Sequence, residues 1–436
     1  MTDATWTVHT APHPKIDKLS EPTEVTPPAY GPKPSYLESS QARHWMFSAR
    51  ELQRQKQEAH DHAASLLRSA TDAEASVEPL SAEEEVAIIR FYLLRIGKIV
   101  KAFGLPSLIE ATAMTLMKRF YLRNSCMQFH PKLIMLTSIY LAAKAENYPI
   151  PLSHFCAQIN KSAGAAPTES KPSAARGDVT ESILSELEYG MVLSLDFEVA
   201  VHGAHRALYG FILDLQTVEP SLTRDDLMVF AGTAQGYIHM SRLTDAEFHY
   251  APSQIAIAAC YMATASRPQG EPLSGKTLVL KWIDAKASMG ATLHMKQRHE
   301  RSTWQQKRQD IYTKGKKVSA FAPASEATAE TGSSSEEHSV DYIKENGLGI
   351  EKDTLLSIVG SIVELIRSVM APQQKPEEAP RPALDMERVK SIDLKLRATL
   401  LQFDKLHTES SRKRSAGEES GPTKRARLDT QDSDSE

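Results

Sequence analysis

Residues 118–145, KRFYLRNSCMQFHPKLIMLTSIYLAAKA, decide the fold of this chain. Pro131 is a residue that readily opens a helix, and the helix it would open is apolar on nearly every side. Its apolar residues are Ile134, Met135, Leu136, Ile139, Tyr140, Leu141, Ala142 and Ala143. A helix that is apolar all round belongs at the centre of a helical bundle. It ends at Lys144, whose charge needs either a partner or a place at a contact surface.

The same pattern occurs a second time, after Pro252, in the run SQIAIAACYMATAS. When the two prolines are aligned, Tyr140 corresponds to Tyr261, and the turns before the two prolines are of the same kind. A central apolar helix that recurs at long spacing predicts two similar all-helical units in one chain. Lys144 corresponds to Ala265, so we expect the units to share a core but not a surface function.

Composition agrees with two soluble helical units. The chain has 436 residues, of which 41% are hydrophobic, enough to bury a core. Its net charge of −4 argues against a general nucleic-acid binder. The three cysteines lack the spacing of a metal site and favour a reducing compartment. No apolar run reaches membrane-spanning length, and the N-terminus lacks a signal-peptide pattern.

The chain divides by composition into five parts. We expect a disordered N-terminus at 1–35, a helical extension at 36–80, a first bundle at 81–202, a second bundle at 203–370 with a mostly disordered insertion at 289–349, and a C-terminal helix followed by a charged disordered tail at 371–436. Each bundle is expected to hold five helices, and the helix at 351–370 supplies the fifth of the second bundle.

No catalytic motif is visible in the sequence. There is no phosphate-binding glycine loop, no metalloprotease HExxH, no G-x-S-x-G and no kinase signature, so we expect neither enzymatic activity nor a cofactor or bound metal. His130 precedes Pro131 in a turn, where a structural hydrogen bond is a better explanation than catalysis.

The chain resembles the cyclin family, most closely the transcriptional cyclins of the H type. The residues that carry the resemblance are SSQARHWMF (39–47), KRFYLRNSCMQFHPKLIMLTSIYLAAKAEN (118–147), ILSELEY (183–189), LSLDFEVAVH (193–202), LTDAEFHYAPSQIAIAA (243–259) and the helix at 351–370. It implies an all-α fold of two tandem five-helix cyclin boxes with extra N- and C-terminal helices.

The resemblance also implies a contact site. In cyclins, a lysine that closes the central helix and a glutamate on the last helix of the first box contact the kinase. By position these are Lys144 and Glu186, with Glu188 close enough to be confused with it. Asn147 departs from the usual K-x-E-E ending, and a purely internal salt bridge is the alternative role. Trp45 and Phe47 either cover the first bundle or contact the kinase.

Two basic clusters in the tail resemble a bipartite nuclear localisation signal. They consist of Arg412, Lys413, Arg414, Lys424, Arg425 and Arg427. A charged tail that only aids solubility is the alternative.

As a whole, the resemblance implies a nuclear regulatory subunit that activates a cyclin-dependent kinase of the CDK-activating, TFIIH type. Such a kinase phosphorylates the carboxy-terminal domain of RNA polymerase II and other cyclin-dependent kinases. The implied partners are the kinase catalytic subunit, a RING-type assembly factor and the TFIIH core, without direct nucleic-acid binding. The alternatives are a Mediator-type cyclin C, an elongation-type cyclin, and a TFIIB-like DNA-binding factor.

Overall fold

The computed structural model describes residues 36–69, 78–162, 179–265, 278–287, 350–372 and 380–418. Within these residues every regular element is a helix, apart from one isolated bridge between Met370 and Pro382, which confirms the all-α prediction. The chain forms two compact units. The first comprises 50–199 and the residues from 385 onward; the second comprises 36–49 and 200–384.

The first unit contains the five helices expected of the first bundle. They are α3 (Ala82–Ala102), α4 (Ser107–Phe120), α5 (Pro131–Ala145), α6 (Leu152–Ser162) and α8 (Glu181–Ser194). The start of α3 is set by a capping box: the Ser81 hydroxyl accepts from the Glu84 N–H, and the Glu84 carboxylate accepts from the Ser81 N–H. Pro131 stands at the first turn of α5, as predicted.

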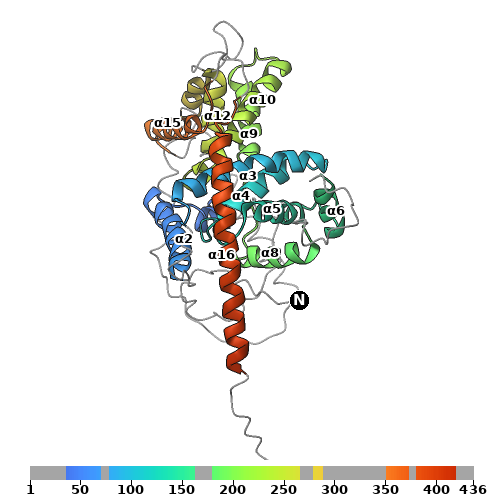
Figure 1. The fold of residues 1–436 in the computed structure, drawn as a ribbon. Helices are drawn as coiled ribbons and strands as arrows, with labels where there is room; N and C mark the ends of the chain where they lie inside the picture. Colours follow the sequence, from blue (N-terminus) through green and yellow to red (C-terminus); the bar gives the residue numbers. More distant parts are fainter. Residues whose placement is uncertain are drawn as a thin grey trace, which may run out of the picture. The chain divides into compact units, whose positions relative to one another are not determined.

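Helix α5 is the centre of this unit. It contacts α3, α4 and α8, and Figure 1 shows it among them. Nearly all of its side chains between Ile134 and Ala143 are buried, the exception being the half-buried Tyr140. The prediction of a central helix apolar on all sides is therefore confirmed.

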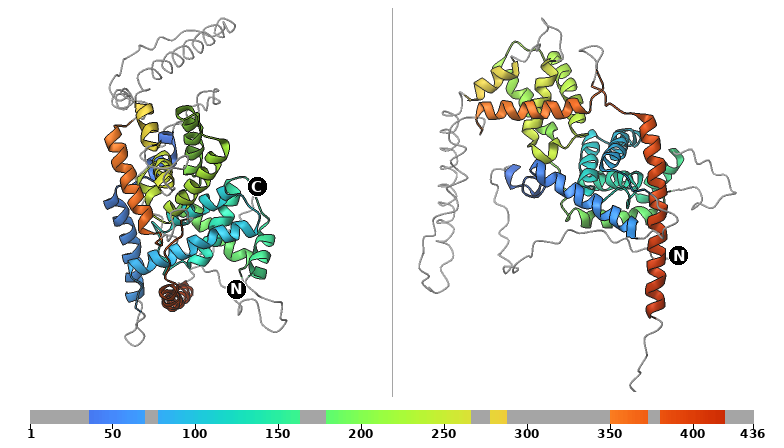
Figure 2. Two further views of the ribbon diagram at one scale, coloured as in Figure 1. Left: turned by 90° about the horizontal axis from the view of Figure 1, so that it is seen from above. Right: turned by 60° about the vertical axis from the view of Figure 1, so that its left-hand side comes forward.

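Two terminal helices belong to the first unit. Helix α2 (Ala49–Ser69) buries Leu52, Ala63, Ala64 and Leu67. Helix α16 (Met386–Glu418) lies against α3 and buries Val389, Ile392, Leu396, Thr399 and Phe403, which recur at helical spacings of three and four. Figure 2 shows its C-terminal part extending away from the other helices of the unit. The C-terminal helix expected within 371–436 thus extends to Glu418, into the segment that we expected to be a disordered tail.

The second unit repeats the arrangement. Its helices are α9 (Ala204–Val218), α10 (Arg224–Ser241), the short α11 (Ala246–His249), α12 (Pro252–Ala265), a helix at 278–287 and α15 (Lys352–Ser368). Helix α12 is the central one, with contacts to α9, α10 and α15. Helix α15 therefore supplies the fifth helix, as predicted. The expected disordered segments at 1–35 and 289–349 lie outside the described residues.

The segment 36–49 belongs to the second unit. It would belong to the first unit if Trp45 and Phe47 covered the first bundle, which was one of their two expected roles. It contains a single 3₁₀ turn, η1 (Tyr36–Glu38), and α1 (Ser40–His44), whose start is capped by the Ser39 hydroxyl. The N-terminal extension expected at 36–80 is thus divided: its first part packs into one repeat, and α2 packs onto the other.

Candidate functional site

The C-terminal end of α5 is shaped to present Lys144 at the surface. The helix ends because Asn147 adopts a left-handed conformation with φ of 61°, which asparagine tolerates better than most residues. The Tyr148 N–H then donates to the Ala143 carbonyl at 2.8 Å, which closes the helix end. A lysine in the last turn is also favoured by the negative end of the helix dipole. Lys144 therefore lies at the exposed C-terminal end of a helix that is otherwise almost entirely buried.

The partner of Lys144 within the chain is Glu188 on α8. The lysine Nζ lies 2.6 Å from the Glu188 Oε1, and it lies 5.4 Å from the centre of the Tyr140 ring. Lys144 keeps 46% of its side chain exposed and Glu188 keeps 17%. A pair with this exposure retains free donors and acceptors on its outer side, where another protein can bind them.

Of the two glutamates between which the sequence could not decide, Glu188 and not Glu186 pairs with Lys144, whereas a kinase contact through Glu186 stays a prediction. Its carboxylate accepts from the Ser182 hydroxyl at 3.0 Å on the exposed face of α8. Two residues along a helix are separated by about 200°, so Glu186 and Glu188 point to different sides. Glu188 follows Leu184 by one turn, on the side of α8 that meets the core, which brings it to the end of α5.

Large apolar side chains remain exposed on the same two elements. Tyr148, just beyond α5, is 47% exposed, and Tyr189 on α8 is 68% exposed. Ile183, in the first turn of α8, is 37% exposed. Exposed apolar side chains on the same segments as an exposed charged pair are typical of a surface that binds another protein.

Trp45 and Phe47 are packing residues of the second unit. Trp45 is only 2% exposed. The Phe47 N–H donates to the Phe248 carbonyl at 2.8 Å, and the two rings lie 6.2 Å apart. Because Trp45 is enclosed, its burial supports a packing role, and a direct contact with a kinase stays a prediction. A contact through the half-buried Phe47 stays a prediction.

Two buried polar residues hold the terminal segments, and sequence reasoning missed both. Gln41 in α1 pairs with the backbone of His202: its Nε2 donates to the carbonyl at 3.2 Å, and its Oε1 accepts from the N–H at 2.8 Å. In the first unit, Glu85 in α3 accepts from the Ser125 hydroxyl at 2.7 Å and from the Cys126 N–H at 3.0 Å.

Glu85 also joins α2 to this unit. The His60 Nδ1 lies 2.6 Å from its other carboxylate oxygen, and this hydrogen bond raises the pKa of His60 above its usual 6.5. The signal for Glu85 was present in the sequence. It precedes Ile88 and Tyr92 on the buried side of α3, and an acid in line with core residues needs buried partners.

His130 has the structural role that the sequence predicts. Its Nδ1 accepts from the Lys132 N–H at 3.0 Å and caps α5. Burial lowers its pKa from the usual 6.5 to about 4, because the charged form loses its hydration.

The basic clusters of the tail are only partly within the described chain. The backbone at 412–414 is helical and belongs to α16, whereas Lys424, Arg425 and Arg427 lie outside the described residues. Among residues that the structure describes, no group of histidine, cysteine and acidic side chains could hold a metal ion. In that same part of the chain, no helix is long and apolar enough to cross a membrane.

Two family models together match most of the chain. The model for the cyclin N-terminal domain matches residues 82–200, and the model for the cyclin C-terminal domain matches residues 203–367. The chain is also 30% identical over 236 residues to cyclin-H of Xenopus laevis, a match that covers 53% of this chain and 69% of that protein. The chain belongs to the cyclin family. The TFIIB-like alternative therefore has no support.

Within the family, this cyclin is of the H type. Besides the Xenopus protein, it is 28% identical over 262 residues to cyclin mcs2 of Schizosaccharomyces pombe, covering 58% of this chain and 73% of that protein. Among solved structures, a chain of the CAK complex from Chaetomium thermophilum bound to ATP-γ-S is similar in fold, with a TM-score of 0.55. It is 19% identical, and the match covers 91% of this chain and 98% of that chain.

Proposed function

We propose that this cyclin binds and activates the catalytic subunit of a cyclin-dependent kinase of the CDK-activating, TFIIH type. The observation that carries the proposal is the Lys144–Glu188 pair, held at the exposed end of an otherwise buried helix. The pair is fixed at 2.6 Å and half open to solvent, so it offers a rigid set of charged hydrogen-bonding groups to a docked protein.

The mechanism is preferential binding. A protein kinase is active only when its regulatory helix is pressed inward, so that its own Lys–Glu pair and metal-binding loop align. A rigid cyclin surface that fits only this arrangement shifts the kinase toward it. Tyr148, near Lys144 in the sequence, and Tyr189, next to Glu188, add exposed apolar area on the same segments. The cyclin contributes no reacting group, which agrees with the absence of catalytic motifs in its sequence.

The substrates that follow from this assignment are the carboxy-terminal domain of RNA polymerase II and other cyclin-dependent kinases. A third subunit of the RING-type assembly factor class and the TFIIH core are the further partners that we propose. The site of action would be the nucleus, with the basic residues of the tail, Arg412 to Arg414 and Lys424 to Arg427, directing import.

Reconstitution tests the proposal. The purified cyclin should lack kinase activity by itself and should raise the phosphorylation of a polymerase carboxy-terminal repeat peptide when mixed with the catalytic subunit. Parallel mixtures with Mediator-type and elongation-type kinase subunits separate the alternatives, because only the CDK-activating type should respond. Kinase activity in the cyclin alone, or equal activation of all three kinases, would contradict the assignment.

Nuclear import is tested separately. A fluorescent fusion that ends at Ser410 should lose nuclear enrichment, and a full-length fusion with the six basic residues intact should keep it. Nuclear retention of the truncated fusion, in cells where its kinase partner is depleted, would refute the role of the tail.

A further inference from the structure

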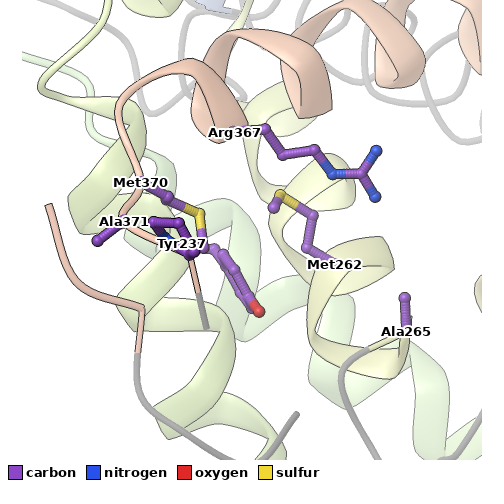
Figure 3. A pocket seen from close by; sticks show the side chains of 7 residues that line it. Tyr237, Met262, Ala265, Arg367, Met370 and Ala371 are labelled. Atoms are coloured by element: carbon purple, nitrogen blue, oxygen red, sulfur yellow. The ribbon is translucent and has the colours of Figure 1, made fainter. Parts of the chain in front are cut away.

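Two features lie outside the Lys144 surface. One is a cavity of about 330 Å³ in the second unit, lined by Tyr237, Met262 and Arg367 among others (Figure 3). The residues described around this cavity do not define what fills it. The other feature is the buried pair of His60 and Glu85, which joins α2 to the first bundle and whose strength depends on a proton.

The pair is short and well enclosed. The His60 Nδ1 lies 2.6 Å from the Glu85 Oε1, and the two side chains keep only 16% and 10% of their area exposed. A hydrogen bond between a protonated imidazole and a carboxylate is stronger than one between neutral groups, and burial reduces its screening by water and salt. Much of the hold that this contact has on α2 therefore depends on the charge of His60.

The two oxygens of Glu85 serve different parts of the first unit. Its Oε2 accepts from the Ser125 hydroxyl at 2.7 Å and from the Cys126 N–H at 3.0 Å, both in the turn before α5. Its Oε1 faces α2. If α2 moved away, the bonds to the turn would keep the carboxylate in place, and one of its oxygens would regain water. Glu85 is thus a fixed acceptor on the bundle, and His60 is the group that attaches to it or releases it.

The charged groups that act on His60 come from α2 and α3. The hydrogen bond to Glu85 is the largest influence and raises the pKa of His60, whereas burial lowers it. The charges of Glu85 and Asp61 raise this pKa further and that of Arg68 lowers it, so the net shift is upward from 6.5. The Cys126 thiol, beside the same carboxylate, has its own pKa raised well above its usual value by burial and by Glu85, so it stays neutral while His60 titrates.

The apolar attachment of α2 is modest. Its buried apolar residues are Leu52, Ala63, Ala64 and Leu67, and the two alanines bury little area. Because the pKa of His60 is raised in the folded chain, the stabilisation from the charged pair is complete below pH 6.5 and is lost as the pH rises through the raised value. Above that value the Glu85 charge stays covered by α2 without an opposite charge beside it, which is unfavourable.

We propose that His60 and Glu85 form a proton-operated latch, which holds α2 on the first cyclin box at weakly acidic pH and lets α2 open locally as the pH rises above neutrality. The opening is confined to α2, because the bonds of Glu85 to Ser125 and Cys126 do not depend on His60. Opening exposes the buried leucines of α2, so the pH sets how much apolar surface this helix offers to other proteins. The latch acts within the cyclin itself, and the proposal is independent of kinase binding.

The test is hydrogen–deuterium exchange of the full-length cyclin, read by mass spectrometry at pH 6.0 and pH 8.5 and corrected for the intrinsic exchange rate. Protection of α2 peptides should fall about fivefold from the lower to the higher pH, the difference between a charged and a neutral hydrogen bond, whereas peptides from the buried α12 should not change. His60→Gln keeps a hydrogen-bond donor that does not titrate, so its α2 should be protected equally at both pH values, at the level of the unaltered chain at pH 8.5. His62→Gln, which removes another half-buried histidine of α2, is the matched control and should retain the fivefold change.

A second measurement keeps the test decisive if a variant folds poorly, which thermal melts would reveal. The His60 ring signal in NMR spectra, assigned by its absence in His60→Gln, should titrate above pH 6.5 in the unaltered chain and at a lower pH in Glu85→Gln. Titration of His60 at or below pH 6.5 in the unaltered chain would overturn the proposal. So would protection of α2 that depends on pH in His60→Gln as in the unaltered chain, loss of that dependence in His62→Gln, or an equal change in α12.

Discussion

The Lys144–Glu188 pair should matter little for the cyclin alone and much for its complex. In the free chain the two side chains are 46% and 17% exposed. Ion pairs open to water contribute about 0–1 kcal/mol, because solvent screens them and their side chains lose conformational freedom. We therefore expect Lys144→Ala and Glu188→Ala each to lower the free energy of unfolding by at most about 1 kcal/mol.

Docking of the kinase changes this balance. If the kinase covers the pair, both charges lose water, and removal of one leaves the other buried without its partner. Truncation of one member of such a pair costs about 2–5 kcal/mol of binding free energy, and 2 kcal/mol corresponds to about a thirtyfold weaker Kd. Because the two residues contact one another, the double variant should lose less than the sum of the single losses.

The measurement is a double-mutant cycle, with Kd from calorimetric titration of the kinase subunit and stability from urea unfolding. Glu186→Ala is the matched control, since it removes the same group from the same helix two residues away, on the exposed face. It should change Kd by less than about 0.5 kcal/mol. If Glu186→Ala weakens binding more than Glu188→Ala does, the assignment made from the geometry is wrong. Strictly additive losses would show that the pair does not act as a unit.

Three further predictions concern the frame that holds this site. Glu85→Ala should destabilise the first unit by about 3–5 kcal/mol in urea unfolding, because it leaves buried hydrogen-bond donors unpaired. Glu85→Gln keeps an acceptor and should therefore lower the free energy of unfolding clearly less. Equal losses in the two variants would contradict this explanation. Because burial lowers the pKa of His130 from 6.5 to about 4, the stability it contributes is full above pH 6.5 and falls by about 3 kcal/mol as the pH drops to 4. His130→Asn keeps a helix cap without titrating, so its stability should vary less with pH over that range, and an unchanged pH profile would count against the assignment. Leu396→Ala, at a fully buried position of α16, should lower the free energy of unfolding by about 2–5 kcal/mol. Leu394→Ala, at a position 73% exposed on the same helix, should change it by less than about 0.5 kcal/mol. Similar losses in both variants would mean that α16 does not pack as described.

Local and periodic features of this chain could be predicted from its sequence. The apolar run after Pro131 identified α5 as the central helix, and its repetition after Pro252 identified α12. Each depends only on the order of residues along one helix. The helix end at Lys144 is local for the same reason.

Features that depend on helix rotation or on distant partners could not be predicted. Glu186 and Glu188 are equally close to the family pattern, and only the rotation of α8 about its axis decides which one meets Lys144. Likewise, Trp45 is a large aromatic residue of the kind often found at protein contacts. The sequence around it does not indicate that the neighbouring Phe47 packs against Phe248, about 200 residues away.

The packing of the terminal segments changes how their loss should be understood. Considered as additions to complete five-helix bundles, the N-terminal segment and the last helix could serve kinase activation and leave both bundles intact when removed. In the structure, however, the segment 36–49 buries Trp45 within the second unit, and α16 buries Leu396 against α3 within the first. Removing either exposes apolar surface that its unit otherwise covers. A loss of kinase activation after such a truncation would therefore report damage to a cyclin box. Only substitutions on the exposed faces of the terminal helices, such as Leu394 on α16, can reveal whether these helices contact a partner directly.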